Sequence, residues 1–146
     1  MQIRKMQIAD YAAVFALWQS CSGMGLNNLD DSREGIARFL ERNPDTCFVA
    51  EAESQILGAI LTGNDGRRGY IYHTAVSPQH QKQGIGTQLV RAALESLRKS
   101  GIHKVALVVF AQNAGGNAFW EKQGFTVRKD LTFRNLTLTE MVRMDT

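Results

Sequence analysis

The sequence has few cysteines, few prolines and no long apolar run, and these shortages exclude several classes of protein. Only two cysteines, Cys21 and Cys47, occur among 146 residues. Both have apolar neighbours, so neither a disulfide framework nor a metal site is expected. The longest apolar stretch, Val105 to Ala111, is far shorter than the roughly 20 residues of a membrane span. The first residues contain no apolar signal-peptide core. We therefore expect a cytoplasmic protein that does not enter a membrane.

The sequence also lacks an excess of charge of one sign. The 17 basic and 14 acidic residues leave a net charge of +3, with no basic stripe interleaved with aromatic residues. This balance does not favour nucleic-acid binding, although it is compatible with a phosphorylated ligand. The chain is 44% hydrophobic, and its length matches one compact domain, which we expect to span residues 1–146.

The spacing of apolar residues predicts alternating strands and helices. Helices are expected after the capping residues Asp10 and Ser32, before Gly101, and over residues 113–123. Strands are expected over seven segments: residues 1–6, 47–52, 56–62, 70–76, 105–111, 126–134 and 136–144. The run from 105 to 111 is apolar throughout, which is typical of a strand buried on both faces. The resulting order, β-α-α-β-β-β-α-β-α-β-β, predicts an α+β domain around a mixed sheet.

The segment between the fourth strand and the long helix carries the clearest chemical signal. It contains the pattern Gln81-x-x-Gly84-x-Gly86. Glycines let the backbone turn sharply, and the first turn of a helix offers unpaired N–H groups and a partial positive charge. Together these features predict a site for a phosphate or pyrophosphate. The site is not a P-loop, because no lysine follows Gly86, and not a dinucleotide fingerprint, because Leu89 replaces the third glycine.

Two motifs resemble signatures of the GNAT N-acetyltransferase superfamily. The segment Gln81-Lys82-Gln83-Gly84-Ile85-Gly86 is similar to its Q/R-x-x-G-x-G/A pyrophosphate loop. The segment from Asn113 to Phe125 resembles its second signature, N-x-x-A-x-x-L-Y-x-x-x-G-F. The order of predicted elements also agrees. The resemblance implies an α/β/α sandwich with a mostly antiparallel sheet, acetyl-coenzyme A (acetyl-CoA) as donor and a primary amine as acceptor.

The resemblance further implies roles for individual residues. The backbone of Ala75 and Val76 would pair with the pantetheine arm, Asn113 would contact that arm, and Trp120 would stand beside the thioester. Lys82 occupies a position that is often glycine, and its side chain is a candidate phosphate ligand. The backbone N–H groups expected to hold the pyrophosphate belong to Gln81, Lys82, Gln83, Gly84, Ile85, Gly86 and Thr87.

The reaction needs a group that removes a proton from the amine. With a pKa near 10.4, roughly one lysine-like amine in a thousand is neutral at about pH 7.4. The resemblance places base candidates at Tyr70 and Tyr72, on one face of the fourth strand. Strict alternation puts His73 on the other face, so we interpret it chiefly as a core histidine and keep it as a third candidate. Asp30 and Asp31 lie in the loop from which relatives commonly build the acceptor site.

Trp120 stands where many relatives have a tyrosine that protonates the leaving thiolate. An indole N–H cannot serve as such an acid. This departure leaves open a second function, that of a binding module that senses acyl-CoA without turnover. An enzyme that transfers a longer acyl group is a further alternative. We expect no metal and no nucleic-acid partner, and a homodimer is one further expectation.

Overall fold

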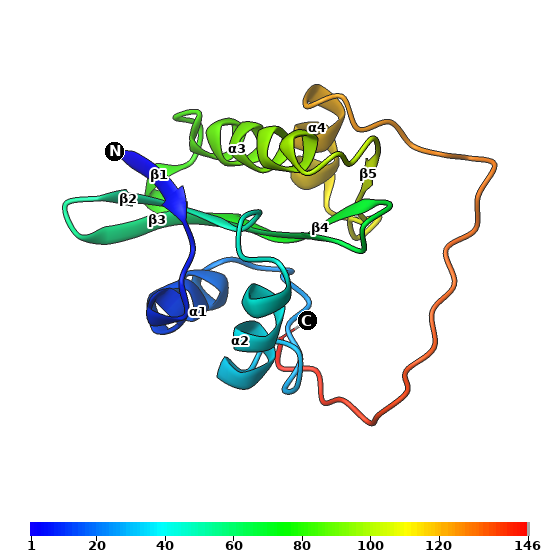
Figure 1. Cartoon of the computed structure of the whole chain (residues 1–146), viewed down its shortest axis with the longest axis horizontal. Coiled ribbons are helices and arrows are strands. Elements are labelled where there is room, and N and C mark those ends of the chain that lie inside the picture. The colour runs from blue at the N-terminus through cyan, green and yellow to red at the C-terminus, as the bar shows by residue number, and fades with distance from the viewer. Residues whose placement is uncertain (146) are drawn as a thin grey trace.

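A five-stranded sheet lies between two layers of helices in the computed structural model, which describes residues 1–145 (Figure 1). The strands are β1 (Gln2–Lys5), β2 (Phe48–Ala52), β3 (Gln55–Asn64), β4 (Gly69–Val76) and β5 (Val105–Ala106). The helices are α1 (Tyr11–Ser20), α2 (Arg33–Arg42), α3 (Ile85–Lys99) and α4 (Ala114–Lys122). The strand order is β1-β2-β3-β4-β5, and only the β4–β5 pair is parallel. The predicted α+β class with a mixed, mostly antiparallel sheet is confirmed.

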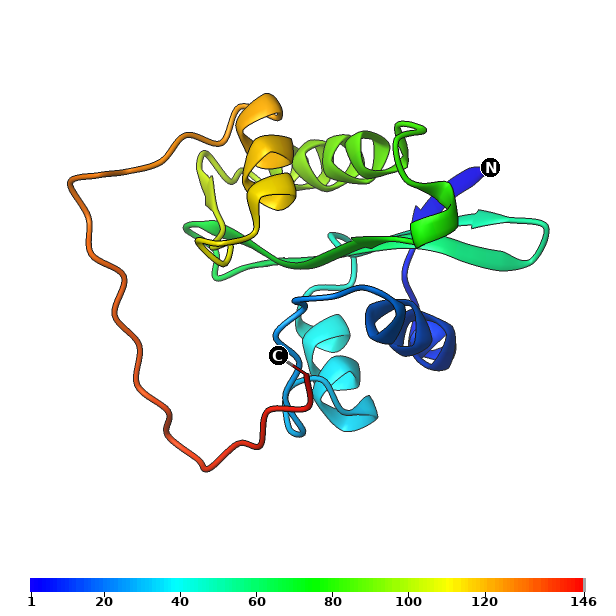
Figure 2. The same ribbon diagram turned by 180° about the vertical axis from the view of Figure 1, so that it is seen from behind.

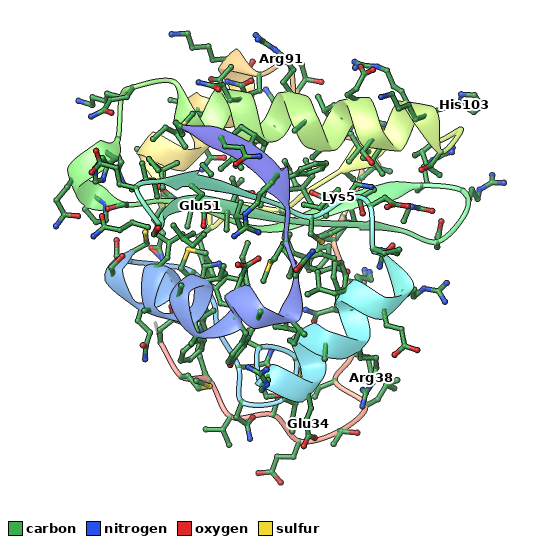
Figure 3. The ribbon with its side chains drawn as sticks, turned by 60° about the vertical axis from the view of Figure 1, so that its left-hand side comes forward. Lys5, Glu34, Arg38, Glu51, Arg91 and His103 are labelled. Carbon is green, nitrogen blue, oxygen red and sulfur yellow. The ribbon has the colours of Figure 1, made fainter. Side chains whose placement is uncertain are left out.

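The two faces of the sheet bury separate cores. Helices α1 and α2 cover one face, and α3 and α4 cover the other (Figures 1 and 3). Trp18, with no exposed surface, is the largest side chain of the α1–α2 core. Leu89, Val90 and Ala93 of α3 pack with Ile60 of β3 in the second core. The apolar repeats of α1, α2 and α3 therefore face the sheet, as the spacing predicted.

Of the three residues predicted to begin or end a helix, Ser32 and Gly101 are confirmed and Asp10 is not. The Ser32 hydroxyl accepts a hydrogen bond from the Gly35 amide at 3.0 Å and caps α2. Gly101, with φ of +80°, follows the end of α3 in the left-handed conformation that favours glycine. Asp10 precedes α1 but does not cap it. Its carboxylate instead binds the Arg4 guanidinium through two 2.9 Å hydrogen bonds and joins β1 to the start of α1.

A β-bulge in β4 overturns the expected facing of the candidate bases. Ile60 of β3 pairs with Thr74, whereas Thr62, two residues on, pairs with Ile71, three residues back. One extra residue of β4 therefore lies opposite β3, and the side-chain alternation slips by one. His73 consequently faces α1, where its ring lies edge-on to Trp18 with centroids 4.9 Å apart. The prediction that His73 and the tyrosines lie on opposite faces is wrong for this reason.

The last third of the chain differs most from the prediction. The strand β5 covers only two residues, and the exposure of the following side chains alternates along an open sheet edge. The prediction of a strand buried on both faces is therefore wrong. The strands predicted over 126–134 and 136–144 are also wrong: apart from one bridge between Asn27 and Arg143, this segment pairs with no described strand. Figure 2 shows it as an extended chain that stands away from the sheet.

The described helices include none whose length and apolar character would suffice to cross a membrane.

Candidate active site

An opening lies between β4 and the chain that continues β5. The two strands pair only at Gly69–Val105 and Tyr70–Ala106, after which both continue without pairing to each other. Across the other edge of β4, the Ser77 amide donates to the Leu57 carbonyl at 2.7 Å. Because successive residues of a strand turn their amides to opposite edges, the Val76 N–H and C=O face the opening. The Val76 C=O already accepts a hydrogen bond from the Gln81 side-chain amide at 3.2 Å, so the Val76 N–H is the group that this edge leaves for an extended ligand.

The first turn of α3 lies beside the end of β4 and has no side-chain cap. Gly84 is its N-cap residue, with φ of +82°, and no side chain caps the N–H groups of this turn. The first helical bond runs from Gln88 N to Gly84 O, at 3.1 Å, so the preceding N–H groups have no helical acceptor. Three of them belong to Ile85, Gly86 and Thr87. Unpaired N–H groups and the helix dipole together suit an anion.

Lys82 adopts a backbone conformation that normally selects glycine. Its φ is +62°, within the left-handed region, as is that of Gly84 two residues later. A non-glycine residue pays about 1–2 kcal/mol for this conformation. Such strain in a loop facing a helix N-terminus is typical of a functional segment. The structure thus gives a reason why glycine is common at this position in similar loops.

Gly86 lies at the contact between α3 and α4. A Cβ atom on Gly86 would lie 3.2 Å from two ring atoms of Phe119 in α4 and 3.7 Å from Val76. Its backbone is ordinary helix, since no positive φ occurs there. The backbone conformation by itself therefore does not require glycine at this position. The small residue lets α4 pack directly over the first turn of α3.

The second motif forms α4 and its attachments. The Asn113 side-chain oxygen caps α4 by accepting a hydrogen bond from the Gly116 amide at 2.9 Å. The Trp120 ring lies edge-on to Phe119 and Phe125, with centroids 5.0 and 5.2 Å away. The Gln123 side-chain amide donates to the Thr87 hydroxyl at 3.0 Å. The two sequence motifs are thus in direct contact, and Trp120 fills space inside an aromatic cluster.

The aromatic residues of β4 line the α2 side of the sheet. The Tyr70 and Tyr72 rings lie 4.6 Å apart, and Phe39 of α2 packs edge-on against Tyr72 at 5.5 Å. Tyr72 remains 51% exposed. Burial raises the pKa of both phenols, and the neighbouring Asp30 carboxylate raises the pKa of Tyr72 further. Both tyrosines therefore stay protonated at neutral pH and are poor bases.

His73 makes a short hydrogen bond to a buried carboxylate. Its Nε2 lies 2.7 Å from Oδ1 of Asp31, a residue only 3% exposed. The other oxygen of Asp31 accepts from the Asn27 amide at 2.9 Å. Asp30, in contrast, is exposed at the surface of the same loop. The two adjacent acidic residues therefore have different environments, which their sequence positions did not indicate.

Two contributors to this region were not identified from the sequence. Phe110, beyond β5, packs against Gly25 in the loop between α1 and α2. A Cβ atom added to Gly25 would lie 3.5 Å from the Phe110 ring. The Cys21 thiol, at the end of α1, lies 3.5 Å from the Val76 carbonyl. Apolar character alone marked both as core residues, and no local pattern distinguished them. Within residues 1–145, no cluster of three or more histidine, cysteine or acidic side chains is arranged to hold a metal ion.

Comparison with known proteins gives a consistent result. The acetyltransferase (GNAT) family matches residues 11–125. An acetyltransferase of Pectobacterium atrosepticum is 33% identical over 122 residues, which cover 84% of this chain and 85% of the relative. One from Sodalis glossinidius is 29% identical over 140 residues, covering 96% and 97%.

A solved structure has the same fold. The PaiA N-acetyltransferase of Thermoplasma acidophilum, in complex with coenzyme A, superposes with a TM-score of 0.77 at 22% identity, over 87% of this chain and 90% of that one. The match to the family covers most of the chain, including both motifs and the opening between β4 and β5. The chain therefore belongs to the acetyltransferase (GNAT) family, and the predicted acetyltransferase activity is confirmed.

Proposed function

We propose that this acetyltransferase moves the acetyl group of acetyl-CoA directly to a primary amine of a small molecule or a protein. The observation that carries the proposal is the opening between β4 and β5, next to the uncapped first turn of α3. Backbone N–H groups of residues 81–87 would hold the pyrophosphate, with Lys82 adding a positive charge. The backbone of Val76 would bind a pantetheine amide as an added strand does. The Ala75 backbone, in contrast to the expectation from the sequence, turns to β3 opposite Ala59 and is not free for this role.

The acceptor amine would enter on the α1–α2 side of the sheet. The rings of Phe39, Tyr70 and Tyr72 lie together, and the exposed Asp30 carboxylate lies near Tyr72. Aromatic faces and a carboxylate both stabilise a cation, so this surface suits an ammonium group. Substrate binding is the role we assign to Asp30, whereas Asp31 is buried too deeply to meet a ligand directly.

His73 is the group that we assign to proton removal. Asp31 is acceptor-only when ionised, so its contact with Nε2 favours the tautomer in which Nε2 carries the proton. Nδ1 then has the free lone pair and can accept a proton from the amine or through a water. The Asp31 carboxylate would stabilise the imidazolium that forms. The protonated Tyr70 and Tyr72 would orient the amine or the water.

The leaving group needs little help in this mechanism. A thiol has a pKa of roughly 8.5, so a thiolate is a tolerable leaving group near neutrality. Trp120, which packs against Phe119 and Phe125, would then act as a spacer beside the thioester. The alternative is a non-catalytic acyl-CoA sensor, and the absence of a tyrosine at position 120 is the observation that favours it.

One assay separates the two functions. The protein is incubated with acetyl-CoA and a panel of primary amines while released thiol is titrated, and CoA binding is measured by calorimetry. We expect binding in the micromolar range, typical of substrate levels, and thiol release that depends on one class of amine. Binding without thiol release for any amine would favour the sensor. No binding at millimolar CoA would contradict both.

A second experiment tests the proton acceptor. We expect His73→Gln and Asp31→Asn to lower kcat/KM by about 10²- to 10⁴-fold, because general-base catalysis contributes that much. The deficit should shrink at alkaline pH, where more of the amine is already neutral. His103→Gln is the matched control, since His103 is exposed at the far end of α3 (Figure 3). A folded His73→Gln variant with an unchanged pH profile would refute the assignment.

We further propose that residues 1–146 form a single domain that acts in the cytoplasm, without a resident metal, nucleic acid or membrane. All strands of residues 1–145 belong to one sheet, which supports a single domain. Both cysteines are unpaired thiols, which fits a reducing compartment. We also propose a homodimer.

A further inference from the structure

One end of the molecule lies far from the loop before α3 and is rich in basic residues. We name residues 65–68 and 95–104 the distal end. They form the β3–β4 turn, the last part of α3 and the chain that leads to β5. Both parts lie on the right in Figure 1, whereas the loop before α3 lies on the left. The Gly69 amide, directly after the turn, donates to the Lys104 carbonyl at 2.9 Å and joins the two parts.

The distal end concentrates the positive charge of the chain. Its charged side chains are all exposed, the basic ones being Arg67, Arg68, Arg98, Lys99 and Lys104 and the acidic ones Asp65 and Glu95. The resulting excess of three positive charges equals the net charge of the whole chain. The charges of all other residues therefore cancel, and an anionic partner is attracted chiefly to this end.

The acidic side chains of the distal end already have partners. The Asp65 carboxylate accepts hydrogen bonds from the Arg67 and Arg68 amides, both at 2.8 Å. Glu95 lies 3.9 Å from Lys99, one turn further along α3. These local contacts leave the remaining guanidinium and ammonium groups of the distal end available to another molecule.

Two of these groups have no carboxylate of their own. Within residues 1–145, neither Arg98 nor Lys104 forms an ion pair. Asp130 is the acidic residue that Lys104 influences, but the pKa of Asp130 is lowered chiefly by its hydrogen bonds to Arg128. Both oxygens of that carboxylate are held by Arg128 at 2.8 Å. Arg98 and Lys104 are thus the cations most open to a ligand.

A small hollow lies between these two cations. Its volume is about 110 Å³, and its lining includes the apolar side chains of Leu97, Ile102 and Val105 and the polar ones of Arg98, His103 and Lys104. Leu97 and Ile102 are nearly buried. Figure 3 shows His103 at the end of α3. The distal end therefore combines an apolar depression with a basic rim.

The size and composition of the hollow select the kind of ligand. Sites for small molecules usually enclose about 300–1,000 Å³, several times this volume. One aliphatic side chain of a partner protein needs much less space, and such anchor residues fill small pockets at protein interfaces. The distal end contains no tryptophan, tyrosine or phenylalanine on which successive bases could stack. These features favour a protein segment over a metabolite or a nucleic acid.

We propose that the distal end binds an acidic segment of a partner protein, with one apolar side chain in the hollow and flanking carboxylates on Arg98 and Lys104. A guanidinium pairs well with a carboxylate, and complementary charge speeds the encounter of the two partners. The 15 residues of α3 span roughly 22 Å, so the segment can bind while the loop before α3 stays accessible. The proposal does not depend on the acetyl donor or acceptor.

Three labelled peptides test the site on the full chain. The first contains only glutamate and aspartate around one central leucine. The second has serine in place of the leucine, and the third has glutamine and asparagine in place of the acidic residues. Binding is measured by fluorescence polarisation at about 50 mM salt, where surface charges are weakly screened. We expect a Kd below about 1 mM for the first peptide, about three- to tenfold weaker binding of the second and at least about tenfold weaker binding of the third.

Charge reversal tests the position of the site. Arg98→Glu/Lys104→Glu should weaken binding of the first peptide by about tenfold or more. Arg38→Glu/Arg91→Glu is the matched control, because it reverses as many charges on α2 and on the exposed face of α3 (Figure 3). It should change the Kd by less than about threefold. An equal loss in both double variants would mean that only net charge matters, which overturns the site. Circular dichroism checks each fold, and the milder Arg98→Gln/Lys104→Gln serves if the reversal unfolds the protein.

The other outcomes also decide the question. Absence of binding at millimolar concentrations of the first peptide overturns the proposal. Equal affinity for the leucine and serine peptides shows that no side chain enters the hollow, and overturns it as well. Tighter binding of a single-stranded RNA of equal charge would make this surface a nucleic-acid site instead. In the wild type, amide chemical-shift changes caused by the first peptide should cluster at residues 65–69 and 94–105, and a cluster elsewhere would refute the placement.

Discussion

Enlarging Gly86 tests whether this glycine serves helix packing or ligand approach. A Cβ at this position would sit 3.2 Å from the Phe119 ring, closer than most carbon contacts allow. Alanine favours a helix over glycine by about 1 kcal/mol, so Gly86→Ala sets that gain against a small displacement of the ring. Gly86→Val adds two further methyl groups toward Phe119 and Val76. We expect it to destabilise the protein by about 1–3 kcal/mol, the usual cost of overpacking.

A double-mutant cycle with Phe119 isolates the cause. Phe119→Leu removes the ring atoms that the new side chain would meet, so Gly86→Val should cost less than about 1 kcal/mol in that background. Residues in contact typically couple by 0.5–3 kcal/mol, roughly the effect expected here. The free energy of unfolding is measured by urea denaturation for the four proteins, and CoA affinity by calorimetry on the folded fraction.

The ligand measurement decides between the two roles of Gly86. If packing is the reason for the glycine, the double variant should bind CoA within about fivefold of the wild type, since the backbone N–H groups remain. If the effects of Gly86→Val and Phe119→Leu on the free energy of unfolding simply add in the double variant, the packing argument is refuted. A double variant that is stable but has lost CoA binding would instead place the pyrophosphate against the Cα of Gly86.

Three further predictions concern other sites. Lys82→Gly, which keeps the left-handed backbone, should raise the Kd for CoA by about two- to fivefold and make that Kd less dependent on salt concentration. If the salt dependence is unchanged in both Lys82→Gly and Lys82→Asn, Lys82 does not contact a phosphate. Trp120→Phe should keep turnover within about tenfold, and a loss of ~10³-fold in a folded variant would give the indole N–H a chemical role. Hydrogen bonding to Arg4 lowers the pKa of Asp10, so its stabilising effect is present above the ordinary value near 4 and is lost as pH falls. Asp10→Asn should therefore unfold at lower free energy at neutral pH but lose less stability on acidification, as thermal unfolding against pH will show; parallel curves would contradict this.

Local patterns predicted the parts of the protein whose physics is local. The proposed pyrophosphate loop could be predicted because glycine spacing, a strand exit and a helix start are adjacent in the chain. Helix caps such as Ser32 follow from side-chain chemistry within one turn, and apolar periodicity identified the buried faces of α1, α2 and α3. The family resemblance rested on the same two short motifs.

Other features depend on contacts between distant segments. The bulge in β4 comes from its register with β3 and moves His73 to the α1 side, where Asp31 meets it across 42 residues. The role of Gly86 is set by Phe119, a residue of another helix. Alternation within one strand contains no information about either partner.

The segment over residues 126–144 shows most clearly what the sequence alone does not determine. Apolar and polar side chains alternate over residues 126–134 as they do in a strand. This alternation indicates only that burial of one face would be favourable. A strand forms when a neighbouring edge accepts its backbone hydrogen bonds, and within the described chain no edge does so. The sequence by itself determined the family, the glycine-containing loop before α3 and the tendency of each segment to form a helix or a strand. Tertiary structure alone decided which side chains meet, because pairing and packing partners lie far apart along the chain.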